Sequence, residues 1–255
     1  MVNLTQTALV GFPQMGAKLG FTKSSAALLK ASEEVVRAKN DLSKVLKGDE
    51  LDALNQAIKD GTIDVTMAHD LAGISQGEDQ GVMWKVRPMM RAASFLFHHA
   101  EKFNRQATFI AAYRLAKAAD PNAKQHQLYE AAQKATYAGH FDHSAGNRPR
   151  LMQGNWQKVI FLFKQYGQNM VYSLARNAFQ SFNKDLKPEE RKQAREALAG
   201  MLAMHAAAAG VLGLPLVGPL LTVASFIGGD DDEPWDAEVA MQNAMADMLG
   251  KDAAE

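Results

Sequence analysis

Apolar residues recur along this chain with the three- and four-residue spacing of amphipathic helices. After serines at positions 24 and 25 that are suited to capping a helix, Leu28, Val35 and Leu42 lie on one face. Gly48 then marks the expected end of this first helix. The sequence lacks the strict alternation of apolar and polar residues that strands show and has no convincing repeat, so it predicts an all-α fold.

The same spacing predicts further helices along the chain. They are expected at residues 49–61, 63–72, 88–119, 129–137, 156–182 and 188–209. Two of them are long, and the helix at 88–119 would make about eight turns at 3.6 residues per turn. We therefore expect a multi-helix, elongated chain with three regions, which are residues 1–81, 82–186 and 187–255.

A long uncharged segment stands out near the C-terminus. Residues 197–229 form a run of 33 without Asp, Glu, Lys or Arg, although charged residues make up 22% of the chain. Glycines and prolines between positions 210 and 219 favour a helical hairpin over one straight helix. Its arms, at about 194–209 and 216–227, are each shorter than the ~20 residues that cross a bilayer of ~30 Å.

Three interpretations of this hairpin stay open: a buried core element, a membrane-inserting element or a protein–protein surface. In the membrane interpretation the apolar side chains would contact lipid, and in the interaction interpretation they would contact another subunit. These residues are Leu202, Val211, Leu212, Leu214, Leu216, Val217, Leu220, Leu221, Phe226 and Ile227.

The zero net charge conceals an uneven distribution. Residues 84–176 hold fourteen Lys or Arg against four Asp or Glu, whereas residues 230–255 hold nine acidic residues and one Lys. The basic segment can contact DNA without sequence specificity or anionic lipid, or it can complement the acidic segment within the fold or between subunits. The basic residues expected at such a contact are Arg105, Arg148, Arg150, Lys158, Lys164 and Arg176.

Catalytic signatures are weak in this sequence. It has neither a phosphate-binding Gly-rich loop nor a nucleophile motif such as G-x-S-x-G, and it has no cysteine. A metal-dependent enzyme could be built on His98, Glu101, His140 and His143, but their spacing is not that of a zinc motif. We therefore predict a protein that is not an enzyme, with no catalytic residue, no metal and no cofactor.

Several phrases of the sequence resemble one known family. These phrases are "AEKFNRQATFIAAYRLA", "FDHSAGNRPRLMQGNWQKVIFLFKQYGQNMVYSLARNAFQSF", "PEERKQAR" and "DDDEPWD", together with the uncharged segment. Over roughly residues 3–250 the chain resembles part of the large polyvalent internal virion proteins of tailed bacteriophages, which are ejected into the host with the genome. It lacks their enzymatic modules and the Pro-Leu-x-Arg-Phe-Gly motif of many relatives, so it is either a short member or a segment.

The resemblance implies a protein stored in the virion interior and present in the host cell envelope after ejection. There it would help to form or anchor a conduit for genome delivery. Other virion core or ejection proteins, further copies of the chain, the host inner membrane and DNA are the expected partners. The alternative is a soluble structural or scaffold component of the virion core or tail, with the hairpin buried between subunits.

Overall fold

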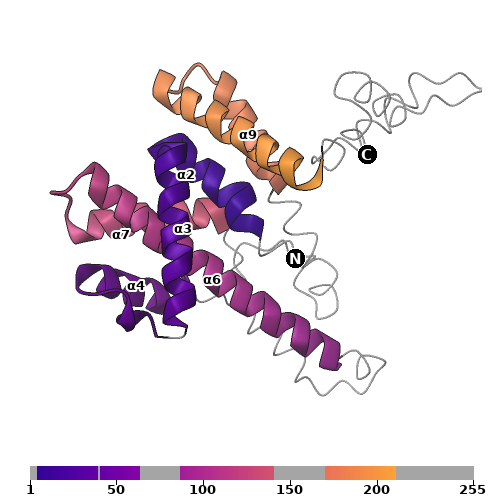
Figure 1. Cartoon of the computed structure of the whole chain (residues 1–255). Coiled ribbons are helices and arrows are strands. Elements are labelled where there is room, and N and C mark those ends of the chain that lie inside the picture. The colour runs from indigo at the N-terminus through magenta and orange to yellow at the C-terminus, as the bar shows by residue number, and fades with distance from the viewer. Residues whose placement is uncertain (1–4, 40, 64–86, 141–169, 211–255) are drawn as a thin grey trace, which may run out of the picture. The chain divides into compact units, whose positions relative to one another are not determined.

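The computed structural model describes residues 5–39, 41–63, 87–140 and 170–210 (Figure 1). Within these ranges the chain is helical and contains no strand, which confirms the all-α prediction for the described part. The elements are a π-helical turn η1 (Thr7–Gly11), α2 (Phe12–Leu19), α3 (Phe21–Ala38), a 3-10 turn η2 (Leu42–Lys44), α4 (Asp49–Lys59), α6 (Arg87–Ala119), α7 (Gln125–His140) and α9 (Pro188–Ala209). Residues 170–182 are also helical.

Helical structure starts well before the serines at 24 and 25. Gly20 lies between α2 and α3 with a φ of 92°, a conformation that glycine adopts without strain. This glycine is the N-cap residue of α3, and Ser24 is buried inside the helix. The prediction that a serine caps this helix is therefore wrong.

The first predicted helix is also shorter than expected. Helix α3 ends at Ala38, and Lys39 follows with a φ of 56°. Asp41 then begins a separate turn, because its side chain accepts a hydrogen bond from the backbone N–H of Ser43 at 3.2 Å. A continuous helix to Gly48 is therefore a wrong prediction.

The other predicted helices agree with the described residues. Helix α4 begins at Asp49, and three acidic residues in its first turn lie where the helix dipole favours negative charge. The ranges of α6 and α9 agree with the predictions at 88–119 and 188–209, whereas α7 is longer at both ends than the helix predicted at 129–137. Of the predicted helix at 156–182 only 170–182 is described, and the predicted helix at 63–72 lies almost wholly outside the described residues.

The core forms around α6, which packs against both α3 and α7 (Figure 1). Phe109 and Ile110 of α6 are buried there, and the Phe109 ring meets the Tyr129 ring edge-on at a centroid distance of 5.8 Å. Leu54 and Ala57 of α4 belong to the same core. Because α2 and α7 bury their apolar faces in this core, their polar faces are available to form the site described below.

The chain divides into two compact units, Met1–Met201 and Leu202–Glu255. The boundary falls inside the single helix α9. Helices of the predicted regions 1–81 and 82–186 share the core of the first unit, and the division at residue 187 stays a prediction. The predicted hairpin beyond Gly210 lies outside the described residues.

Candidate functional site

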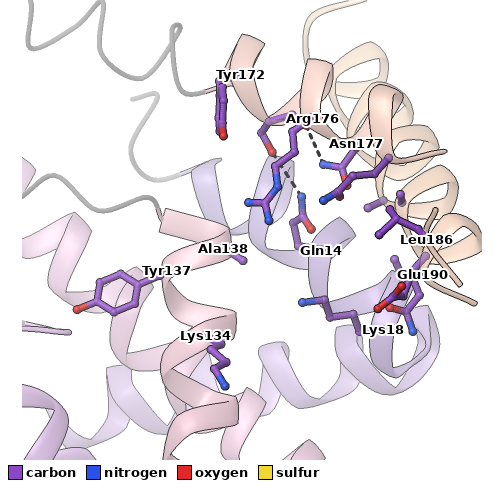
Figure 2. Close-up of a pocket in the computed structure, with 16 residues that line it drawn as sticks. Gln14, Lys18, Lys134, Tyr137, Ala138, Tyr172, Arg176, Asn177, Leu186 and Glu190 are labelled. Atoms are coloured by element: carbon purple, nitrogen blue, oxygen red, sulfur yellow. Dashed lines mark hydrogen bonds between the residues drawn. The ribbon is translucent and has the colours of Figure 1, made fainter. Parts of the chain in front are cut away.

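A cavity of about 600 Å³ lies in the first unit among α2, α7, residues 170–182 and α9 (Figure 2). This volume is within the range of sites for small molecules. The lining combines cationic, amide and tyrosine side chains with alanines and a leucine, so it offers a ligand both polar and apolar contacts.

Positive charge exceeds negative charge in the lining. Lys18, Lys134 and Arg176 come from three different helices, and Glu190 is the carboxylate that lines the cavity with them. Figure 2 shows Lys18 and Arg176 extending into the same space, with Gln14 between them in this view. The structure therefore gathers cations that are far apart in the sequence.

These charges are poorly compensated within the described residues. Neither Lys18 nor Arg176 has an ion pair there, while Lys134 contacts Glu130 at 3.5 Å. The pKa of Lys18 is lowered, first because surrounding protein atoms desolvate its ammonium group and then because Arg176 and Lys134 repel it. A bound anion would relieve that repulsion.

Hydrogen bonds hold one wall of the cavity in place. Gln14 Nε2 donates to Ser173 Oγ at 3.4 Å, which links α2 to the helical residues 170–182. Asn177 Nδ2 donates to the Ser173 carbonyl at 2.8 Å. The side chains of Gln180 and Gln193 also line the cavity and make no hydrogen bond to the described residues, so their amides can serve a ligand.

Two tyrosines lie at the edge of the cavity in different situations. The Tyr137 hydroxyl lies 3.4 Å from the Thr62 hydroxyl, so its polar end is already engaged. Tyr172 is 67% exposed and precedes Arg176 by one helical turn on the same face. Its ring is therefore accessible beside the guanidinium group.

Arg105, which the sequence suggested as a contact for DNA or lipid, is buried in the core. Only 2% of its side chain is exposed, and its Nε donates to Glu101 Oε1 at 2.7 Å. Its two terminal nitrogens donate to the carbonyls of Thr62, at 3.0 Å, and His140, at 3.3 Å. The prediction for Arg105 is wrong, because this side chain ties α6 to the segment after α4 and to the end of α7.

The suggested metal ligands have other roles in the described residues. Glu101 holds Arg105, and His140 Nε2 lies 2.8 Å from Thr108 Oγ1. His98 is half-buried and His99 exposed, and their ring centroids are 5.6 Å apart. In the part of the chain that the structure describes, no three His, Asp or Glu side chains form a group that could hold a metal ion. His143 lies outside this part.

The remaining predicted residues are mostly outside the described ranges. Leu202 is described and is 36% exposed, whereas the other apolar hairpin residues, from Val211 to Ile227, are not described. Arg148, Arg150, Lys158 and Lys164 also lie outside the described residues. Of the two basic candidates that are described, Arg105 and Arg176, only Arg176 lines the cavity. Among the helices described, none combines the length and the apolar character that crossing a membrane would need.

Lys18 and Lys134 were not singled out from the sequence. No local motif surrounds either residue, and only the packing of α2 and α7 brings them near Arg176. Comparison with known proteins adds no further guide, because no family model, curated protein or solved structure matches the chain. The chemistry of the cavity therefore has to be argued from its own residues.

Proposed function

We propose that the chain is an internal virion protein of a tailed bacteriophage, ejected into the host to form or anchor part of a conduit for the genome. The observation that carries this proposal is the position of the uncharged segment in the fold. Only its residues 197–201 belong to the first unit, and from Leu202 onward it belongs to the second. Most of the segment thus belongs to a different compact unit from the one that contains the core built around α6.

Helix α9 connects a charged surface to this apolar segment. It begins with Pro188 and two glutamates in its first turn, and its last residues are alanines. Ala197 and Met201 are buried in the first unit, whereas Leu202 and Ala203 are exposed. Exposed apolar surface at the start of a long uncharged segment supports insertion into a membrane or contact with another subunit.

In this proposal the segment folds as a helical hairpin and the complete chain is elongated. The virion interior is its first location, and the host cell envelope follows after ejection. Its partners are other core or ejection proteins, further copies of the chain, the inner membrane and DNA bound without sequence specificity. The sequence phrases from Asn104-Arg105 to "DDDEPWD" support this assignment.

Co-flotation with vesicles that contain phosphatidylglycerol tests membrane insertion directly. We expect the full chain to float at high salt, because apolar burial persists when surface charges are screened. A variant with Leu214→Asp and Leu220→Asp should remain at the bottom of the gradient, since buried carboxylates oppose insertion.

A matched control adds two carboxylates to the first unit instead. Leu29 and Val36 are 73% and 65% exposed on α3, so Leu29→Asp with Val36→Asp should float like the unchanged chain. If neither the unchanged chain nor the control floats, membrane insertion is wrong. Presence of the protein in purified virions would then favour the soluble scaffold alternative, whereas its absence from virions would overturn both.

A further inference from the structure

The cationic cavity of the first unit has the composition of a site for a phosphate group. Arg176 offers a planar fork of N–H donors, and Lys18 adds a compact ammonium charge from α2. Both groups lack an ion pair within the described residues and extend into one space. Charge-assisted hydrogen bonds from such a pair favour a doubly charged phosphate over a neutral ligand.

An aromatic ring and amides lie beside these cations. Tyr172 is exposed and lies one helical turn from Arg176. A nucleobase can stack on a tyrosine ring with little preference for its identity. The amides of Gln180 and Gln193 present donors and acceptors of the kind that pair with the edge of a base.

We propose that this cavity binds one nucleotide unit, with the phosphate at Lys18 and Arg176 and the base on the Tyr172 ring. Its volume of about 600 Å³ accommodates a mononucleotide. The unit comes either from a free nucleotide or from a single strand of nucleic acid, since both present a phosphate next to an unpaired base. This inference does not rest on the membrane role.

Measuring the affinity of the full chain for three probes distinguishes a free nucleotide from a single strand as the ligand. The probes are inorganic phosphate, deoxythymidine monophosphate and a fluorescent oligonucleotide of ten thymidines, measured by calorimetry or anisotropy. We expect the mononucleotide to bind at least tenfold more tightly than phosphate. A free nucleotide is the source if the oligonucleotide binds no better per nucleotide, and a single strand is the source if it binds more tightly. Equal binding of phosphate and mononucleotide, or no binding of any probe, overturns the proposal.

Matched charge variants test whether binding occurs in the cavity. Arg176→Gln and Lys18→Gln each remove a lining cation and should weaken binding about tenfold. Arg195→Gln and Lys23→Gln remove exposed cations elsewhere and should leave the affinity within twofold, with all four variants equally helical by circular dichroism. Equal losses in both pairs would show general electrostatic attraction and overturn the proposal.

A second matched pair separates base recognition from phosphate recognition. Tyr172→Ala should weaken binding of the mononucleotide about tenfold and leave binding of inorganic phosphate unchanged. Phe179→Ala is the control, because Phe179 is 72% exposed on the same helix and does not line the cavity. Equal effects of the two variants would overturn the role of Tyr172. None of these assays contains lipid, so their outcome is independent of the flotation result.

Discussion

Arg105 and Arg176 belong to the same basic segment of the sequence but have opposite environments in the fold. Arg105 is 2% exposed and donates to Glu101 and to two backbone carbonyls. Arg176 is exposed, lines a cavity with Lys18 and Lys134, and has no ion pair among the described residues. One guanidinium group therefore stabilises the fold, while the other is available to a ligand.

The difference teaches that an excess of basic residues does not by itself define a binding surface. A buried guanidinium requires enough acceptors to replace water, and Arg105 finds them in one carboxylate and two carbonyls. An exposed guanidinium keeps its water and needs no such partners. The environment created by helix packing decides which role each arginine has.

The largest expected effect comes from breaking the buried ion pair. Arg105→Ala leaves the Glu101 carboxylate and two carbonyls without their donor, and should lower the free energy of unfolding by about 3–5 kcal/mol. Urea denaturation measures this change. Arg37→Ala is the control, because Arg37 and Glu33 form a pair with the same four-residue spacing at 67% and 65% exposure. That control should lose about 0.5 kcal/mol or less, and equal losses would contradict the distinction.

The next largest effect on stability is expected where Gly139, the neighbour of His140, lies close to Gly11. A Cβ on Gly139 would lie 2.8 Å from the Cα of Gly11, a backbone atom that cannot move away alone. Gly139→Ala should therefore lower the free energy of unfolding by about 1–3 kcal/mol, as over-packing does. The reciprocal Gly11→Ala places its Cβ at an ordinary 3.8 Å and should change stability by about 0.5 kcal/mol or less. Thermal unfolding of both variants checks the asymmetry.

A smaller effect on stability should appear at alkaline pH, through the hydrogen bond between Tyr129 and Asp60. The Tyr129 hydroxyl donates to Asp60 Oδ2 at 2.7 Å. Desolvation by burial, followed by this hydrogen bond to Asp60, raises the pKa of Tyr129 from 10.0 to about 12. Folding thus favours the neutral hydroxyl, and its contribution is complete below pH 10 and is lost as the pH rises toward 12.

Tyr129→Phe should remove that pH dependence. Below pH 10 the variant should lose about 1 kcal/mol of stability through the missing hydrogen bond, and the difference from the unchanged chain should shrink above that pH. Denaturant titrations at a series of pH values measure it. A difference that stays constant up to pH 12 would contradict the assigned role of the hydroxyl.

The smallest stability effect is expected in the cavity. Arg176→Gln removes a cation that repels Lys18 and breaks no described ion pair, so it should change the free energy of unfolding by about 0.5 kcal/mol or less. The pKa of Lys18 should rise toward its ordinary value, which NMR titration of the lysine can follow. A large loss of stability would mean that Arg176 is structural, like Arg105.

The sequence predicts the helices better than their junctions. The ranges of α6 and α9 follow from apolar spacing and from Pro188 near a helix start. The end of α3 does not, because residues up to 48 keep the spacing while Asp41 starts a new turn through its own side chain. Local hydrogen bonds overrode the pattern at that junction.

The candidate site was less accessible to prediction than the helices. Arg176 was expected from its place in the basic segment, and the structure gives it Lys18 and Lys134 as neighbours from distant helices. Periodicity predicts which face of a helix is apolar but not which polar faces meet across a cavity. The burial of Arg105 escaped prediction for the same reason, because two of its acceptors are backbone carbonyls supplied by other elements.

The contact between Gly11 and Gly139 also bears on how this protein can diverge. Position 139 admits no side chain without shifting backbone, whereas Tyr137 and Ala138, its neighbours on α7, line the cavity and are half-buried. Adjacent positions on α7 therefore differ widely in the substitutions that they tolerate. A substitution at position 137 or 138 would change the lining of the cavity, whereas a side chain at position 139 would force the backbone of η1 and α7 apart.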